Sequence, residues 1–146
     1  MFAFEYCART SLTDVRELLS VSGLPSSDID ARACKNFLLA MTDNDELAGV
    51  VGLEKYKQSG LLRSLAVRSD ARNSGLGKEL VKHMEVNAME SGIESLYLLT
   101  TTAEDFFIRL NNSPTNRNTV PLDIAQTSEF SSLCPDTAAC LWKSLV

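Results

Sequence analysis

The sequence has no long hydrophobic run, and its basic residues are outnumbered by acidic ones. None of its apolar stretches reaches the roughly 20 residues that a membrane-spanning helix needs. The net charge is −5, which disfavours nucleic acid and membrane partners, because both attract a basic face. The first residues also lack a basic segment followed by an apolar one. We therefore expect no secretory signal and a cytoplasmic location.

Histidine and paired cysteines are scarce as well. The chain contains one histidine and four cysteines, and no two cysteines form a Cys-x-x-Cys pair. This spacing does not support a four-ligand zinc site, so we expect no metal. In a reducing compartment, the expected state of the four cysteines is a set of buried free thiols.

The length and the hydrophobic pattern favour one α/β domain over residues 1–146. A chain of 146 residues with 45% hydrophobic residues can bury a sizeable core. Alternating and helical periodicities then predict the order of elements. Strands are expected at 2–8, 37–41, 46–56, 61–67, 95–100 and 138–145, and helices at 12–22, 27–33, 75–91, 103–110 and 121–133. This order predicts a sandwich with a mixed sheet.

The most informative segment is the loop Arg72–Lys78, which connects a strand to a helix. The first amides of a helix are unpaired and carry a partial positive charge. Glycines at 75 and 77 let phosphate oxygens approach the backbone closely, because no Cβ stands in the way. Arg72 and Lys78 add positive charge at the rim. The loop therefore fits a pyrophosphate cradle.

Other phosphate loops fit this segment less well. In a P-loop, Ser or Thr follows the Gly-Lys pair, whereas Glu79 follows here. The dinucleotide fingerprint requires a glycine at the position of Leu80. Taken alone, the glycines are equally consistent with a tight turn that binds nothing.

With this loop, the sequence resembles the GNAT family of acyl-CoA N-acetyltransferases. Arg72, Gly75 and Gly77 match the family motif Arg/Gln-x-x-Gly-x-Gly/Ala, which follows a strand similar to residues 65–67. A second family segment, Asn-x-x-Ala-x-x-Phe-Tyr-x-x-x-Gly-Phe, is similar to residues 100–112. A narrower resemblance, through residues 61–67, 96–102 and 132–135, is to the subgroup named for arsenic-resistance gene clusters. That label concerns gene context and does not imply that the chain binds arsenic.

The resemblance implies a three-layer sandwich whose mixed, mostly antiparallel sheet is split between the fourth and fifth strands. It also implies acetyl-CoA as cosubstrate, whose pantetheine arm pairs with the fourth strand. The amine attacks the thioester directly, without an acyl-enzyme. The implied cofactor-binding residues are Leu65, Ala66, Val67, Arg72, Asn73, Ser74, Gly75, Leu76, Gly77, Lys78, Thr100 and Phe107.

The sequence departs from the family pattern at several positions. Phe107 stands where the family often has a tyrosine that protonates the departing thiolate, and a phenyl ring has no such proton. Thr100 replaces the family asparagine and could bind the cofactor or cap the following helix. The pair 111–112 is Asn-Asn instead of Gly-Phe, and asparagine tolerates a left-handed helix stop. The fourth strand carries no carboxylate.

Three side chains are candidates for catalysis or substrate binding. Glu54 could accept the amine proton as general base, or be a surface carboxylate. Arg63 could bind a substrate carboxylate with two hydrogen bonds, or point into solvent. Cys134 could lie near the thioester, or pack inertly.

We therefore expect an N-acetyltransferase that acts on a small primary amine, such as an amino acid or an amine-bearing toxicant. Two alternatives stay open: a catalytically silent acetyl-CoA-binding module, suggested by the missing tyrosine and glutamate, and a protein N-acetyltransferase. The chain would act as a monomer or a homodimer.

Overall fold

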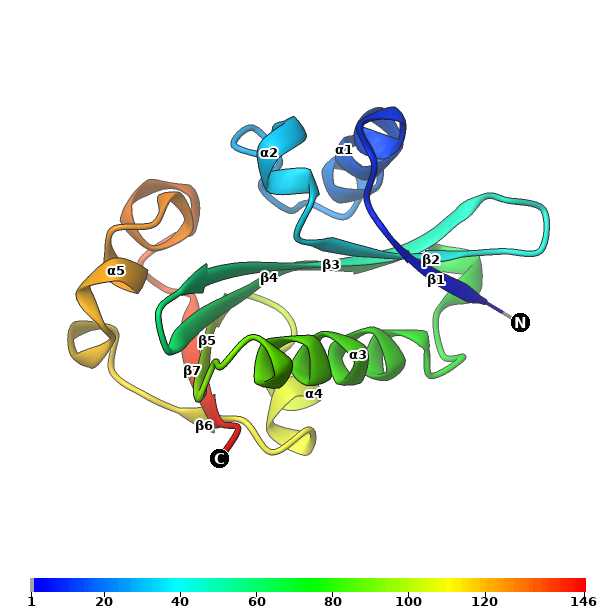
Figure 1. Ribbon diagram of the computed structural model, residues 1–146. Helices are drawn as coiled ribbons and strands as arrows, with labels where there is room; N and C mark the ends of the chain where they lie inside the picture. The colour runs from blue at the N-terminus through cyan, green and yellow to red at the C-terminus, as the bar shows by residue number, and fades with distance from the viewer. Residues whose placement is uncertain (1) are drawn as a thin grey trace. The chain divides into compact units, whose positions relative to one another are not determined.

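The computed structural model describes residues 2–146 and contains one mixed sheet. Its seven strands run in the order β1-β2-β3-β4-β5-β7-β6 (Figure 1). The strands are β1 Ala3–Tyr6, β2 Phe37–Met41, β3 Leu47–Tyr56, β4 Ser59–Val67, β5 Ser95–Thr100, β6 Ser113–Pro114 and β7 Ala139–Ser144. Strands β4 and β5 are parallel, and the α/β fold with an open mixed sheet is the predicted one.

Helices connect most of these strands. The α-helices are α1 Leu12–Val21, α2 Ala31–Cys34, α3 Leu76–Glu90, α4 Glu104–Arg109 and α5 Leu122–Ala125. Three short 3₁₀ turns, η1 Arg9–Ser11, η2 Ser69–Ala71 and η3 Arg117–Thr119, and a π-helical turn, η4 Glu129–Leu133, complete the chain. No helix within residues 2–146 combines the length and apolarity needed to cross a bilayer.

The chain divides into two compact units. Unit 1 holds the residues up to Leu53 together with Ser64–Val86, and unit 2 holds Glu54–Arg63 together with Asn87–Val146. The boundary cuts through β3, β4 and α3. The single-domain organisation stays a prediction.

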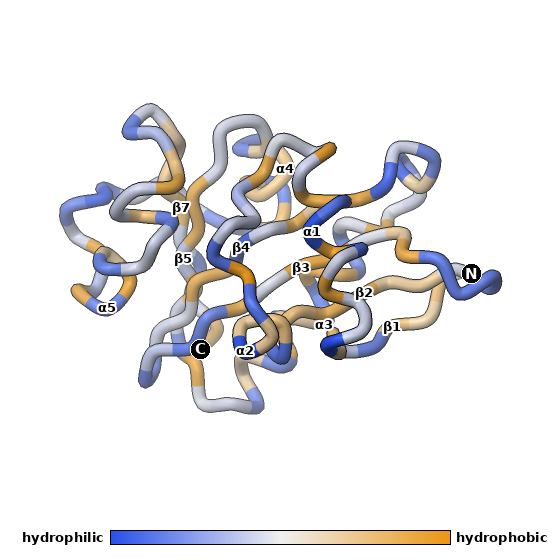
Figure 2. The backbone as a smooth tube through the Cα atoms, turned by 90° about the horizontal axis from the view of Figure 1, so that it is seen from above, coloured by the Kyte–Doolittle hydropathy of each residue, from blue (hydrophilic) through white to orange (hydrophobic). Residues whose placement is uncertain are grey.

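Unit 1 has the three layers of a sandwich. Helices α1 and α2 lie on one face of the strands, and the start of α3 lies on the other (Figure 1). Because both faces are covered, β2 and most of β3 are buried. Figure 2 shows these inner strands mainly in hydrophobic colours and the connecting loops mainly in hydrophilic ones. The core on the α1 side is built from Val15, Leu18, Leu19, Ile29, Phe37, Leu39, Val50 and Ala66 with two cysteines.

Gly49 brings α3 close to the sheet. A Cβ at Gly49 would lie 2.9 Å from Cδ1 of Leu80 and 3.3 Å from Cδ2 of Leu76. Both leucines are fully buried, so packing holds the first two turns of α3 at a fixed distance from β3. This contact positions the loop that precedes α3.

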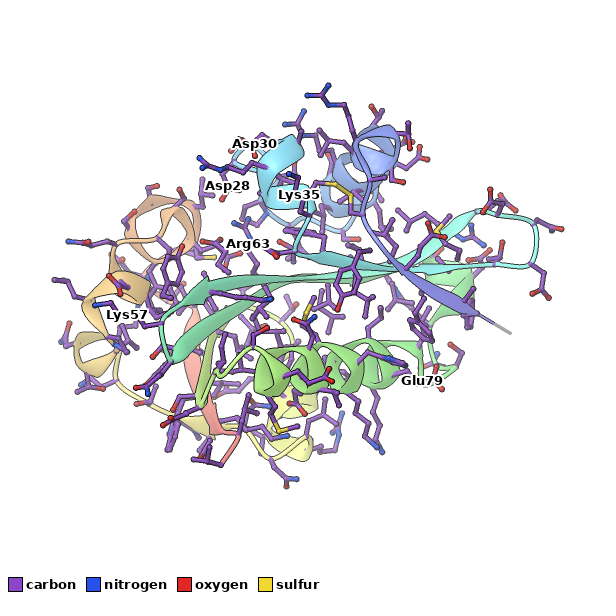
Figure 3. The ribbon with its side chains drawn as sticks, viewed as in Figure 1. Asp28, Asp30, Lys35, Lys57, Arg63 and Glu79 are labelled. Atoms are coloured by element: carbon purple, nitrogen blue, oxygen red, sulfur yellow. A yellow bond between two sulfur atoms is a disulfide. The ribbon has the colours of Figure 1, made fainter. Side chains whose placement is uncertain are left out.

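The two cysteines in the core of unit 1 correct the expectation of four free thiols. Cys7 and Cys34 form a disulfide, visible as the yellow sulfur–sulfur bond in Figure 3. It ties the end of β1 to α2. Cysteine spacing alone could not identify this pair, because four cysteines allow three pairings. Cys134 and Cys140 are free, as expected.

Unit 2 is built on the start of β4 and on β5, β7 and β6. Residues Ser59–Leu61 pair in parallel with Ser95–Tyr97, and β5 pairs antiparallel with β7 along its whole length. The core contains Leu61, Val120, Ile124, Phe130 and Cys140. The Arg117 guanidinium donates to the carbonyls of Phe130 and Pro135. These hydrogen bonds tie η3 to residues 130–135.

The helix expected at 121–133 is wrong as a single element. It is broken into α5 and η4, and Thr127 explains the break. The Thr127 hydroxyl donates to the Ile124 carbonyl at 2.7 Å and accepts the Phe130 amide at 3.4 Å. A threonine that bonds to local backbone in this way competes with helix continuation. Strand β6 was not predicted, because two residues carry no periodicity.

Candidate active site

The loop at Arg72–Lys78 has the backbone of an anion cradle. Asn73 and Gly75 adopt left-handed conformations with φ of 64° and 82°, and α3 begins directly afterwards at Leu76. Alternation of left-handed and right-handed residues turns successive amides towards one side. The first amides of α3 have no carbonyl one turn earlier in the helix. The loop therefore presents amides to a ligand.

Polar side chains hold this loop in place. Arg72 Nε donates to the Val67 carbonyl at 3.1 Å, and the Ser74 hydroxyl donates to the Ala71 carbonyl. Arg68 forms a 2.6 Å hydrogen bond with Asp70. That hydrogen bond is the main reason why the pKa of Asp70 lies below its usual value. These contacts hold the backbone through its carbonyl groups and do not use the amides of residues 73–77.

The loop is open to solvent around Gly75. A Cβ placed on Gly75 would meet no atom within 4 Å, so the space around this residue is open. Asn73, Ser74 and Lys78 are exposed, whereas Leu76 anchors the helix in the core. The predicted loop residues thus lie together in unit 1, and their binding of acetyl-CoA stays a prediction.

The end of β4 precedes this loop. Ser64 has a left-handed φ of 59° in the middle of the strand, which marks an irregularity of the bulge type. After it, Ala66 packs into the core, while Leu65 and Val67 are half-buried. Alternate residues point to the same face of a strand. Pairing of this edge with the pantetheine arm stays a prediction.

The remaining two predicted cofactor residues lie in unit 2. The Thr100 hydroxyl accepts the Ala103 amide at 2.9 Å, so it holds the turn that leads into α4, whose N-cap residue is Ala103. Phe107 is buried and packs edge to face against Phe106. Its carbonyl accepts both the backbone and the side-chain amide of Asn112. Asn111 has φ of 73°, which confirms the left-handed helix stop.

Glu54 and Arg63 come together in unit 2. Arg63 Nη1 lies 2.8 Å from Glu54 Oε2, and its Nε lies 3.6 Å from Glu129 Oε1. The Tyr56 hydroxyl donates to the other oxygen of Glu54. Arg63, labelled in Figure 3, is 2% exposed in its side chain and Glu129 is 5% exposed, whereas Glu54 is 26% exposed. We call these four residues the Glu54 cluster.

Burial and charge keep Tyr56 protonated in this cluster. Burial is the first cause that raises the Tyr56 pKa well above its ordinary value, and the hydrogen bond to Glu54 is the second. The phenol therefore donates to Glu54 throughout the physiological pH range. Glu54 is the carboxylate of the cluster that solvent or a ligand can reach.

Two members of the cluster were missed by the sequence analysis. Tyr56 stands two positions after Glu54 on β3, and the alternation of side chains along a strand places both on one face. That signal was present. Glu129 had none, because it lies far along the chain in the segment expected to be one helix.

Two other expectations concern Cys134 and metal binding. Cys134 is half-buried, and its amide donates to the Glu129 carbonyl at 3.0 Å. It therefore lies near the cluster in unit 2, and a catalytic role stays untested. No group of three or more metal-binding side chains gathers anywhere in residues 2–146.

The loop, the irregular β4 and the parallel β4–β5 pair define an acyl-CoA transferase fold, and a family comparison agrees. The model of the acetyltransferase (GNAT) family matches residues 10–110. The chain therefore belongs to this family. The comparisons do not show membership of the arsenic-resistance subgroup.

One curated relative is an amino-acid acetyltransferase. Residues of this chain are 33% identical over 63 positions to the amino-acid acetyltransferase of Ralstonia nicotianae (strain ATCC BAA-1114 / GMI1000). That match covers 42% of this chain and 14% of the relative. The chain therefore spans only a small part of the length of this relative.

Solved structures share the fold. N-acetylglutamate synthase from Neisseria gonorrhoeae, complexed with coenzyme A and N-acetyl-glutamate, matches with a TM-score of 0.86 and 18% identity. The match covers 100% of this chain and 35% of that chain. Rv2747 from Mycobacterium tuberculosis, in complex with CoA and NLQ, matches with a TM-score of 0.82, 14% identity and 99% coverage of both chains. At these identities, the likeness establishes the fold.

Proposed function

We propose that the protein transfers an acetyl group from acetyl-CoA to a small primary amine. The observation that carries this proposal is the loop geometry: a left-handed Asn73 and Gly75 directly before α3, with open space around Gly75. Bound acetyl-CoA supplies the thioester. The amides of the loop and the charge of Lys78 hold the pyrophosphate, while Leu65 and Val67 orient the pantetheine arm.

Glu54 is the base in this proposal. The amine nitrogen attacks the thioester carbonyl, the carbon–sulfur bond breaks, and Glu54 accepts the amine proton through a water. The CoA thiolate takes its proton from water or from the new ammonium, since Phe107 has none to give. Support for Glu54 comes from its partial exposure and from its place on β3, next to β4 in the sheet.

Arg63 has two candidate roles. Its guanidinium already holds Glu54 at 2.8 Å, which favours a role in orienting the base. The role predicted from sequence is to anchor an acceptor carboxylate, and the amino-acid relative favours it. A substrate carboxylate would then share the guanidinium with Glu54 and Glu129. Amino acids are therefore the first acceptors to test, followed by amine-bearing toxicants.

Calorimetry with acetyl-CoA and an assay for CoA release across a panel of amines test the proposal. Binding together with amine-dependent release of CoA is expected. Binding without release on any amine would favour the silent module, and acetylation of peptides alone would favour a protein N-acetyltransferase. Matched amines with and without a carboxylate separate the two roles of Arg63. If Arg63→Ala lowers kcat/KM equally for both members of a pair, Arg63 does not anchor the carboxylate.

A further inference from the structure

The buried charges of unit 2 call for a physical explanation. Arg63 and Glu129 are almost fully buried, and burying an ion pair usually gives less stability than apolar side chains of the same volume would. Glu129 also begins a π-helical turn. Such turns are rare and occur frequently at functional sites. Stability alone does not account for these charges.

The Glu54 cluster carries more negative than positive charge. One guanidinium faces two carboxylates, those of Glu54 and Glu129, which leaves one negative charge in excess. Tyr56 adds none, because its phenol stays protonated.

Three further ionisable groups of unit 2 bear on the electrostatics of the cluster or of the residues packed next to it. The negative charge of Asp123 on α5 contributes to the raised pKa of Tyr56. The Arg117 Cζ atom lies 5.6 Å from the centre of the Phe130 ring. The positive charge of Arg117 acts to lower the pKa of Cys140. The pKa of the Cys140 thiol is raised by burial, so that thiol stays neutral. Glu129, 3.6 Å from Arg63 Nε, is a carboxylate that competes with Glu54 for Arg63.

We propose that Glu129 is a positioning residue that acts on Glu54 through Arg63. By sharing the guanidinium, Glu129 prevents Arg63 from neutralising Glu54 completely and keeps Glu54 basic enough to take a proton from an amine. This inference rests on the proposed role of Glu54 as base. It assigns a function to a residue that lies outside the motifs of the sequence.

Glu129→Gln is the first test, because it removes the charge and keeps the shape. Arg63 would then face one ionised carboxylate fewer, so its charge would act more strongly on Glu54 and make Glu54 a weaker base. The acidic limb of the kcat/KM profile against pH should move down by about one pH unit, in the range expected for one nearby charge in protein. The plateau should fall several-fold, because a weaker base transfers protons more slowly. Two amines of different basicity identify the limb that belongs to the enzyme.

The double variant Arg63→Met/Glu129→Met shifts the profile in the opposite direction. It removes the cation together with its buried partner, and apolar side chains of similar volume are usually tolerated in place of a buried pair. Glu54 then loses the guanidinium that lies 2.8 Å away and becomes easier to protonate. The acidic limb should move up relative to the wild type. Structural damage would not produce opposite shifts in the two variants.

Two further variants complete the test. In a Glu54→Gln background, Glu129→Gln should have no further effect on the pH profile, because the group through which Glu129 acts is absent. Glu94→Gln, which changes an exposed glutamate of unit 2, should leave the wild-type profile unchanged.

The outcomes separate this inference from the proposed function. If neither Glu129→Gln nor the double Met variant moves the acidic limb, the inference is overturned while acetyl transfer stands. A limb that moves in the same direction in both variants also overturns it. A fully active Glu54→Gln enzyme removes both the base and this role of Glu129. Failure of the wild type to release CoA with any amine contradicts the proposed function itself.

Discussion

The proposed phosphate loop of unit 1 and the Glu54 cluster of unit 2 consist of different chemical groups. The loop uses backbone amides, and its side chains mainly hold the backbone in shape, as Arg72 and Ser74 do. The cluster uses side chains from three separate segments and buries two of its charges. A backbone site depends on φ angles, whereas a side-chain site depends on the identity of each ionisable group. Mutations in the loop should therefore change affinity, and mutations in the cluster should change turnover and pH dependence.

The largest expected effect comes from the cluster. Glu54→Gln should lower kcat by about ten- to a thousandfold near neutral pH, an effect that overlaps the lower part of the roughly 10²- to 10⁴-fold contribution of a general base. The loss should shrink at high pH, where the amine is already neutral. Steady-state kinetics across pH measures both effects, and calorimetry should show unchanged affinity for acetyl-CoA. Full activity across the pH range would exclude Glu54 and leave ordered water or Cys134 as candidates.

A disulfide stabilises unit 1, whereas the two cysteines of unit 2 are free thiols. Loss of the Cys7–Cys34 bond, which closes a separation of 27 residues, should cost about 3 to 4 kcal/mol by the loop-entropy estimate. For a chain of this size, this corresponds to a fall in Tm of about 10 °C. Thermal melts of the Cys7→Ala/Cys34→Ala variant measure it.

Reductant provides the control for this prediction. It should lower the Tm of the wild type, and it should leave the Tm of the double variant unchanged. If reductant lowers both melting temperatures equally, the effect does not come from this bond.

Valine in place of Gly75 tests the role of the loop, and valine in place of Gly92 is the matched control. Gly75 and Gly92 stand before and after α3 with φ of 82° and 84°, and both have open space around a Cβ. Valine at either position meets the same backbone strain, of about 1 to 3 kcal/mol. The backbone can relieve this strain by changing its conformation. Only at Gly75 would such a change turn the loop amides away from the proposed position of the pyrophosphate. Calorimetry should show a Kd for acetyl-CoA at least about tenfold higher in Gly75→Val.

Gly92→Val should melt at a similarly reduced temperature and keep the affinity of the wild type. Equal loss of affinity in both variants would mean that general destabilisation, and not the loop, explains the effect. An unchanged Kd in Gly75→Val would remove the pyrophosphate assignment.

The loop and most of the sheet could be predicted from sequence because their signals are local. The glycine spacing stands next to a helical stripe, and the strands of unit 1 show as apolar runs between turn residues. The expected strand at 37–41 and the helix at 75–91 match β2 and α3 closely.

The cluster and the disulfide could be predicted only in part, because each is made by residues far apart in the chain. Glu54 and Arg63 were selected singly, and no pattern indicated that they pair with each other. Glu129 lies in a segment whose helix is broken by Thr127, a contact that depends on local backbone geometry. Tertiary structure, and not spacing, brings these groups together.

The smallest expected effect contrasts an exposed ion pair with the buried one. The Arg68–Asp70 pair at the entry to the loop is exposed, while Arg63 and Glu129 are buried. Exposed pairs contribute little and are screened by salt, whereas buried charges are screened much less. Asp70→Asn should therefore lower Tm by no more than about 2 °C at neutral pH and low salt.

The pH dependence of this small effect has a definite sign. Because the hydrogen bond from Arg68 lowers the pKa of Asp70 below 3.8 in the folded protein, the pair stabilises the fold at higher pH. That stabilisation is lost as the pH falls through the lowered pKa. The Tm difference between wild type and Asp70→Asn should then vanish in strong acid, and also in about 1 M salt at neutral pH. A difference that grows towards low pH would mean that ionised Asp70 stabilises the fold less than protonated Asp70 does, which would contradict the stabilising pair. In the same high salt, most of the difference in acidic limb between wild type and Glu129→Gln should persist, because Arg63 and Glu129 are buried and their charges are screened much less than those of an exposed pair.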